Sequence, residues 1–114
     1  MARRRRRLPT ATEINDDRTG EKDFMEAVVM TARVLGWLVF HPWTSIHSEA
    51  GFPDLTMVRV RDGVGQVIFA ELKSERGRPD RKQQEWASAL EQCPGVRYFL
   101  WRPSDRDQIT EVLT

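Results

Sequence analysis

The sequence predicts an α/β fold, a small mixed sheet flanked by helices, with its elements in the order α-β-β-β-α-β-α. Two patterns predict it: a helical spacing between positions 21 and 35, and short runs rich in Val, Ile, Phe and Trp separated by turn residues. A second helical pattern lies between the last two of these runs. At 114 residues, the chain is long enough for one core and too short for two.

The first half of the expected domain is a helix, a short strand and a loop. The helix begins near Gly20, and one of its faces carries the residues Glu21, Met25, Val28, Ala32 and Leu35. Gly36 supplies a stop signal for this helix. The β-rich segment 37–41 is then expected to form a strand, and residues 42–53 a loop with turn residues at both ends.

A β-hairpin is expected next. Residues 54–60 alternate between the two faces of a strand, and "RDGVG" at 61–65 makes a turn. The following strand, 66–73, is apolar on both faces as far as Phe69, which predicts a central position in the sheet.

The last third supplies a helix, a strand and a final short helix. Asp80 is the expected N-cap of a helix that runs to about Gln92. A strand is expected at 96–101, and Ser104 is expected to cap the closing helix.

Residues 1–19 form the expected flexible basic arm, and residues 20–114 the expected domain. Residues 1–20 carry six arginines against Glu13, Asp16 and Asp17, a net charge of +3, so the rest of the chain carries −2 of the overall +1. Five consecutive arginines attract phosphate in a salt-dependent way. A solubilising leader is an equally good interpretation of the same run.

Composition excludes several classes of protein. No apolar run approaches the roughly 20 residues that a membrane span needs, and no apolar region typical of a secretory signal follows the arginines. A single cysteine, Cys93, excludes an internal disulfide framework and indicates a reduced, cytoplasmic thiol. The sequence has no P-loop, GxSxG or zinc motif, so no nucleotide cofactor is expected.

Three ionisable residues stand in or beside the hairpin. Side chains alternate along a strand, so Glu71 and Lys73 share one face. Pairing across the 61–65 turn places Asp54 near position 72, beside both of them. Two neighbouring carboxylates repel each other unless a cation lies between them, and such oxygen ligands suit Mg²⁺ or Mn²⁺. The alternative is a partly buried ion pair at a strand end.

These residues and their context resemble the PD-(D/E)xK nuclease superfamily, and within it the VRR-NUC domains that stand alone in phages and bacteria. The resemblance covers about residues 20–113. It is carried by Pro53-Asp54, Glu71-x-Lys73, Gln83-x-x-Trp86 and a glutamate on the first helix.

The resemblance implies a restriction-endonuclease-like core and a nuclease that cleaves phosphodiester bonds, often in branched DNA such as Holliday junctions. It implies that Asp54, Glu71 and the backbone carbonyl of Leu72 bind Mg²⁺ or Mn²⁺, and that Lys73 assists catalysis. A homodimer is expected by analogy, because two cuts on a branched junction need two symmetry-related sites.

Two candidates have a functional and a structural interpretation. Glu21, rather than Glu26, lies on the helix face expected to pack on the sheet, where it would reach the metal; it also suits the first helical turn, where the helix dipole favours a carboxylate. Gln83 faces the sheet with Trp86, where it would line the catalytic site. The same Gln83 fits a capping box with Asp80.

The remaining candidates are basic, histidine and loop residues. A cluster after the acids is expected either to bind DNA phosphates or to be a solvated loop: Arg76, Arg78, Arg81 and Lys82. Weaker candidates for metal, substrate or base contacts are His41, His47, Ser48, Glu49 and Trp43.

The sequence therefore predicts a cytoplasmic, Mg²⁺-dependent endonuclease that acts on DNA, with structure selectivity for branched substrates. Two alternatives stay open. One is a catalytically inactive DNA-binding accessory protein on the same fold. The other is a nuclease that acts on linear DNA, flap DNA or RNA.

Overall fold

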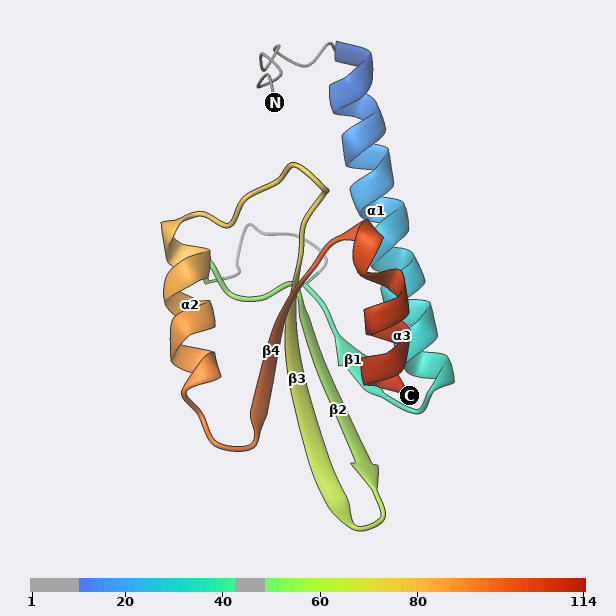
Figure 1. Cartoon of the computed structure of the whole chain (residues 1–114), viewed down its shortest axis with the longest axis vertical. Coiled ribbons are helices and arrows are strands. Elements are labelled where there is room, and N and C mark those ends of the chain that lie inside the picture. Colours follow the sequence, from blue (N-terminus) through green and yellow to red (C-terminus); the bar gives the residue numbers. More distant parts are fainter. Residues whose placement is uncertain (1–10, 43–48) are drawn as a thin grey trace, which may run out of the picture.

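The computed structural model describes residues 11–42 and 49–114, with the backbone alone described for 11–19. It confirms an α/β fold with a small mixed sheet between helices, in the predicted order of elements (Figure 1). The elements are α1 (Ala11–Val34), β1 (Leu38–Phe40), β2 (Leu55–Arg61), β3 (Val64–Leu72), α2 (Arg81–Glu91), β4 (Val96–Trp101), the 3₁₀ turn η1 (Pro103–Asp105) and α3 (Arg106–Leu113). No helix in the described ranges is both long and apolar enough to cross a membrane.

The sheet has the strand order β1-β2-β3-β4. The pairs β1·β2 and β2·β3 are antiparallel, and β4 lies parallel to β3. The central position predicted for β3 is confirmed, because it pairs along its length with β2 on one side and β4 on the other. Helix α2 makes the connection from β3 to β4 that a parallel pair requires.

Helices cover the two faces of the sheet unequally. Helices α1 and α3 lie together over one face and α2 lies over the other (Figure 1). The main core is on the α1 and α3 side, where the buried residues are Phe24, Val28, Val29, Ala32, Trp37, Leu55, Met57, Ile68, Ala70, Trp101, Ile109 and Leu113. Helix α2 contains no buried residue, so its layer is thinner.

Arg59 is a buried charge on this core face. Its guanidinium lies 4.2 Å from the centre of the Trp37 ring and donates hydrogen bonds to the carbonyl oxygens of Leu35 and Leu113. The buried guanidinium therefore contacts an aromatic ring and donates to backbone carbonyl oxygens at the ends of two helices. It joins the ends of α1 and α3 to the middle of β2.

The hairpin turn is tighter than the predicted 61–65 segment. Only Asp62 and Gly63 lie between β2 and β3, and both have positive φ, 52° and 76°. Two consecutive residues with positive φ are typical of the two-residue turns whose twist matches that of paired strands. Both strands are consequently longer at the turn end than the sequence pattern indicates.

Helix α1 begins at Ala11 rather than near Gly20. The second half of the predicted flexible arm is therefore helical, while residues 1–10 lie outside the described ranges. Residues 11–19 contain neither proline nor glycine, so nothing in them stops a helix from extending backwards from its packed part. Apolar periodicity did not reveal this extension, because it reports only the packed part of a helix.

The predicted cap of the last helix is wrong. Ser104 lies inside η1, and α3 begins only at Arg106. The backbone N–H and the hydroxyl of Ser104 both donate to the carboxylate of Glu75, at 2.6 and 3.0 Å. The side chain of Glu75, which is distant in sequence, thus binds the N–H and the hydroxyl of Ser104, and this hydroxyl does not cap α3.

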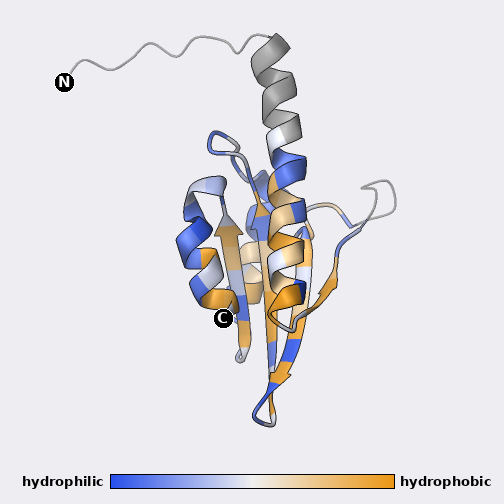
Figure 2. Cartoon of the chain, turned by 90° about the vertical axis from the view of Figure 1, so that its right-hand side faces the viewer, coloured by the Kyte–Doolittle hydropathy of each residue, from blue (hydrophilic) through white to orange (hydrophobic). Residues whose placement is uncertain are grey.

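Figure 2 shows how hydropathy follows this layering. Apolar residues gather on the C-terminal half of α1 and on the strands behind it, while the start of the described side chains in α1 is polar. The core therefore lies beside the C-terminal half of α1.

Candidate active site

The four residues before β2 each contribute to the site. Gly51 has a φ of +85°, and a Cβ on it would lie 2.4 Å from the backbone of Lys82, so only glycine lets the loop approach α2 this closely. The ring of Phe52 contacts Phe69 and Trp86 edge to face, at 5.8 and 5.0 Å between centroids. Pro53 is fully buried. The segment "GFPD" therefore fixes where Asp54 enters the sheet.

The register of the hairpin brings Asp54 to Glu71. Leu55 pairs with Ala70, so one further step along the ladder sets Asp54 opposite Glu71, one residue from the predicted position 72. The carboxylate Oδ2 of Asp54 accepts a hydrogen bond from the backbone N–H of Leu72 at 2.8 Å. This bond fixes the orientation of Asp54 at the end of the strand pair.

Glu71 is a buried acid. Its side chain is 2% exposed and lies on the α2 side of β3, the same side as Phe69. Burial, a hydrogen bond with Asp54 and the charge of Asp54 together raise the pKa of Glu71 to about 9, although the charge of Lys73 acts in the opposite direction. Its oxygen Oε2 is buried and has no hydrogen-bond partner among the described residues.

Lys73 follows β3 directly and is half-buried. Its backbone N–H donates to the carbonyl of Trp101 at 3.0 Å, which continues the pairing of β3 with β4 by one residue. A Cβ on Gly77 would lie 3.4 Å from Cδ of Lys73, so the turn at Gly77 lies close to the lysine stem. The structure therefore brings Asp54, Glu71 and Lys73 together, as predicted.

The loop after Lys73 is held by Arg102, the residue that follows the neighbouring strand β4. The guanidinium of Arg102 donates to the carbonyl oxygens of Ser74 and Gly77, at 2.5 and 2.6 Å. The N–H of Gly77 bonds back to the Ser74 hydroxyl at 3.0 Å, and Glu75 binds η1. This loop is consequently a fixed turn on the surface of the domain.

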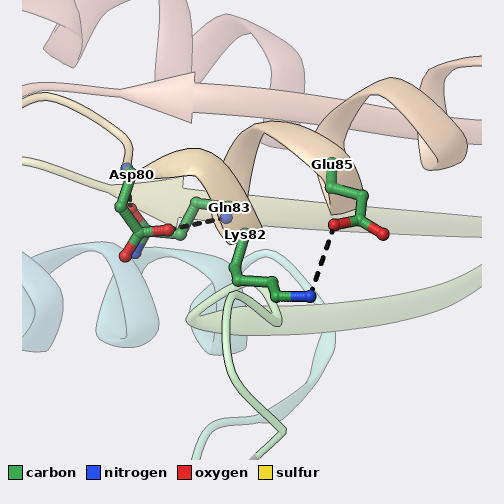
Figure 3. A network of polar contacts seen from close by, with 4 residues as sticks. All are labelled: Asp80, Lys82, Gln83 and Glu85. Carbon is green, nitrogen blue, oxygen red and sulfur yellow. Dashed lines mark hydrogen bonds and ion pairs between the residues drawn. The ribbon is translucent and has the colours of Figure 1, made fainter.

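The predicted phosphate-binding residues surround this turn. Arg76 and Arg78 lie in the loop, and Arg81 and Lys82 lie in the first turn of α2; all four are exposed. Nζ of Lys82 is 3.6 Å from a carboxylate oxygen of Glu85 (Figure 3). An exposed pair of this kind contributes little to stability, so the lysine remains accessible to a competing anion.

Gln83 takes part in a capping box with Asp80. The N–H of Gln83 donates to Oδ1 of Asp80, and the N–H of Asp80 donates to Oε1 of Gln83, both at 2.9 Å (Figure 3). The predicted capping box of Gln83 with Asp80 is therefore confirmed. The charge of Asp80 contributes to raising the pKa of Glu71, so the start of α2 lies near the acid pair.

Glu21 is not brought to the acid pair in this structure. Helix α1 packs on the sheet face of Ile68 and Ala70, whereas Glu71 lies on the other face. Glu21 is exposed, and the described residues include no group of three or more acids, histidines or cysteines able to hold a metal. The suggested dipole role is wrong, because α1 begins at Ala11 and Glu21 is not in its first turn.

The weaker candidates lie apart from the acids or cannot be placed. His41 lines a groove with α1, and the exposed Glu49 lines another with α2. Trp43, His47 and Ser48 lie outside the described residues.

Two site residues were missed by sequence reasoning. Tyr98 pairs with Phe69 in register and so lies on the same face as Glu71; burial raises its pKa to about 12, and the charge of Glu71 acts in the same direction. A tyrosine followed by the apolar residues Phe99, Leu100 and Trp101 was the available signal. Arg102, which holds the loop, gave no local signal, because its partners precede it by 28 and 25 residues.

The chemistry of the donors suits a small divalent cation. Two carboxylates and the carbonyl of Leu72 are hard oxygen ligands at the end of two paired strands, and one carboxylate oxygen is buried without a hydrogen-bond partner among the described residues. Mg²⁺ binds to one or two carboxylates and keeps several waters, so it does not require a third acid. Comparisons with family models, with curated proteins and with solved structures find no match to this chain.

Proposed function

We propose that this chain is a metal-dependent endonuclease that hydrolyses phosphodiester bonds of DNA, with branched DNA as its preferred substrate, in the cytoplasm of a bacterial or phage-infected cell. One observation carries the proposal. Asp54 and Glu71 meet at the end of two strands beside Lys73, and one buried oxygen of Glu71 has no partner among the described residues. A pair of adjacent acids is costly unless a cation or a proton neutralises it.

Asp54, Glu71 and the carbonyl of Leu72 would hold the metal. When bound, Mg²⁺ or Mn²⁺ would lower the pKa of an attacking water and stabilise the negative charge on the phosphoryl group. The bond from the Leu72 N–H orients Asp54 in advance, and burial fixes Glu71, so neither side chain has to be ordered during binding.

Lys73 has two tasks in this proposal. Its ammonium group holds the attacking water in line with the scissile bond, and it compensates the negative charge that develops on the phosphate. Hydrolysis with the 3′-oxygen as leaving group would give a 5′-phosphate end.

The basic turn supplies a route for the DNA backbone. Arg76 and Arg78 lie on the loop that Arg102 fixes, next to Lys73, and Arg81 begins α2 nearby. Contacts of this kind position phosphates without reading sequence, which suits recognition by shape. The adjacent acids Asp54 and Glu71 disfavour a purely DNA-binding accessory, because carboxylates that no cation or proton neutralises repel phosphate.

The experiment is a cleavage assay on linear, flap and four-way DNA with Mg²⁺, with Mn²⁺ and with EDTA. The wild type is compared with Asp54→Ala and with Glu111→Ala, a matched removal of an exposed acid on α3, the helix over the other face of the sheet. We expect metal-dependent cleavage, highest on four-way DNA, which Asp54→Ala abolishes and Glu111→Ala retains.

The outcomes separate the alternatives. Cleavage by Asp54→Ala at the wild-type rate, or cleavage in EDTA, contradicts the proposed mechanism. Tight binding of DNA without cleavage in any metal supports the accessory protein, and cleavage confined to linear or flap DNA overturns the preference for four-way DNA.

A further inference from the structure

A small pocket lies between α2 and the turn that leads into the acid pair. Its volume is about 310 Å³, at the small end of the roughly 300–1,000 Å³ that is usual for sites of small ligands. Neither Asp54 nor Glu71 lines it, so the pocket is separate from the candidate active site. The residues that line it are Glu49, Ala50, Lys82, Glu85, Trp86 and Ala89.

One wall of the pocket is a tight turn held against α2. The N–H of Phe52 donates to the carbonyl of Glu49 at 3.2 Å, which closes the turn 49–52. Gly51 is the third residue of this turn and has a φ of +85°, as a type II turn requires at that position. There is no room for a Cβ on Gly51 beside the backbone of Lys82, so the turn touches α2 directly. The pocket is therefore preformed.

Trp86 supplies an aromatic wall. Its side chain is partly exposed, and its ring meets that of Phe52 at 79°, with 5.0 Å between centroids. An edge-to-face neighbour of this kind covers at most one face of the indole. An indole that lines an open pocket offers a stacking surface to a planar ligand. The pocket therefore suits a flat, aromatic ligand.

Three charged side chains surround this wall. Nζ of Lys82 lies 3.6 Å from a carboxylate oxygen of Glu85, and both side chains are mostly exposed (Figure 3). Glu49 adds a second exposed carboxylate from the turn. A carboxylate only accepts hydrogen bonds, and an ammonium group only donates them. The pocket thus offers two acceptor groups and one donor group to a polar ligand.

We propose that this pocket binds an unpaired guanine base of the DNA substrate, an inference that rests on the proposed function. Guanine carries on adjoining atoms one acceptor, O6, and two donors, N1–H and the N2 amino group. Lys82 would donate to O6, and the carboxylates of Glu85 and Glu49 would accept from the two donors. Bases outside a duplex are recognised in this way, by stacking and by hydrogen bonds to their pairing edge.

The other bases match the pocket less well. Adenine and cytosine each present an amino group beside a ring nitrogen that accepts, so one carboxylate would face an acceptor. Thymine presents a single N–H between two carbonyl oxygens, with the same consequence. In paired guanine, cytosine already binds all three groups, so only an unpaired guanine can use them. Such a base is available where the arms of a branched DNA separate.

The aromatic contacts join the pocket to the acid pair. The ring of Phe52 lies between those of Trp86 and Phe69, and Phe69 is on the same face of β3 as Glu71. Asp54 follows the turn 49–52 after a single residue. A base held at Trp86 would therefore direct the phosphates of its neighbours toward the acids. This continuity favours a base within DNA over a free nucleotide.

The experiment measures binding of the full chain to labelled single-stranded oligothymidylate that carries one central test base, by fluorescence anisotropy in EDTA. We expect guanine to bind about tenfold more tightly than adenine, cytosine or thymine, which is within the range of one good bidentate contact. Inosine lacks the N2 amino group and should bind less tightly than guanine. 7-Deazaguanine keeps all three groups and should bind like guanine.

Variants connect this preference to the pocket. Glu49→Ala and Glu85→Ala should each reduce the preference for guanine, and the variant that no longer distinguishes guanine from inosine identifies the acceptor of the N2 amino group. Trp86→Ala should weaken the binding of guanine about tenfold through the loss of stacking. The matched control is Glu91→Ala, which removes an exposed acid of α2 outside the pocket and should keep the preference. Circular dichroism checks that each variant is folded; Glu49 is exposed on a turn, so its variant keeps the test valid if Trp86→Ala unfolds.

Three results would overturn the proposal. The wild type would bind all test bases equally, or Glu49→Ala and Glu85→Ala would both keep the full preference for guanine. Binding of dGMP as tight as that of the guanine oligonucleotide would make the ligand a free nucleotide.

The cleavage assay reports separately on the proposed nuclease. A preference for guanine without cleavage in any metal would retain the base pocket and remove the nuclease. Metal-dependent cleavage without a preference for guanine would do the opposite.

Discussion

The two faces of the sheet differ in what they bury. Toward α1 and α3, β3 presents Ile68 and Ala70, both fully buried among aliphatic and aromatic side chains. Toward α2, the same strand presents Phe69 and the acid Glu71. Neighbouring residues of one strand therefore belong to two environments, one uniformly apolar and one that contains a buried carboxyl group.

The difference follows from how completely each face is covered. Two helices close the first face, and its residues are packed as in any protein core. On the second face, α2 has no buried residue and leaves large apolar residues of β1 and β2 exposed, such as Leu38 and Phe40. A thinly covered face next to a strand end lets ionisable groups lie near solvent and substrate. The acid Glu71 and the main core thus lie on opposite sides of one strand.

The largest expected effect is that of Lys73→Ala on catalysis. Loss of the ammonium group removes the charge that compensates the phosphate, so we expect cleavage to fall by about 10²- to 10³-fold. The side chain is half-buried at a loop, so the midpoint of urea unfolding is expected to change little. Measurement of cleavage, DNA affinity and unfolding in parallel checks this; a variant that cleaves normally would remove Lys73 from the mechanism.

Met57→Ala is the matched change on the opposite face. Met57 is fully buried in the core, so we expect a loss of about 2–5 kcal/mol in the free energy of unfolding. At a temperature where the variant is folded, cleavage should stay near the wild-type rate. A large loss of cleavage in folded Met57→Ala would show that the two faces are not independent.

Glu71→Gln sharpens the comparison through pH. The pKa of Glu71 is about 9 in the folded protein and near 4.5 for an ordinary glutamate, because burial and Asp54 disfavour its charge. Stability from the neutral form is thus fully present below about 4.5 and is lost as the pH rises through about 9. In EDTA, the wild type should weaken across this range relative to Glu71→Gln, as urea unfolding at several pH values would measure.

We expect Mg²⁺ to offset this loss of stability in the wild type. Addition of Mg²⁺ should stabilise the wild type at pH 8 and leave Glu71→Gln nearly unchanged, because the neutral amide is a poor substitute for a carboxylate ligand. If both proteins showed the same pH dependence in EDTA, the buried acid would not be the cause.

Local signals predicted much of this molecule. The element order, the cap at Asp80 and the juxtaposition of Asp54 with Glu71 all follow from patterns within a few residues of each site. The register was one residue off because the turn has only the two residues Asp62 and Gly63. Periodicity alone could not set the length of that turn.

The sequence did not report how separate elements pack together, and this packing decides the contacts of Glu21 and Arg102. The helical pattern indicates which side of α1 packs on the sheet, but it does not indicate on which of the two faces of the sheet it packs. Since Glu71 lies on the other face, a correct helical face gave no contact with the acids. Arg102, the residue after β4, binds the loop that follows the neighbouring strand β3, and no spacing within the sequence reports such a contact.

The smallest expected effect is that of Gln83→Ala, which tests whether Gln83 only caps α2 or also contacts the substrate. Oε1 of Gln83 already accepts from the N–H of Asp80, so we expect a cost of about 0.5–1 kcal/mol in unfolding free energy from the lost half of the capping box. Cleavage should fall less than about tenfold, because a capping residue shifts the start of α2 without supplying a charge. Gln83→Glu is the control, since glutamate also closes a capping box and should restore the stability. A fall in cleavage as large as that of Lys73→Ala, with stability unchanged, would instead place Gln83 among the groups that contact the substrate.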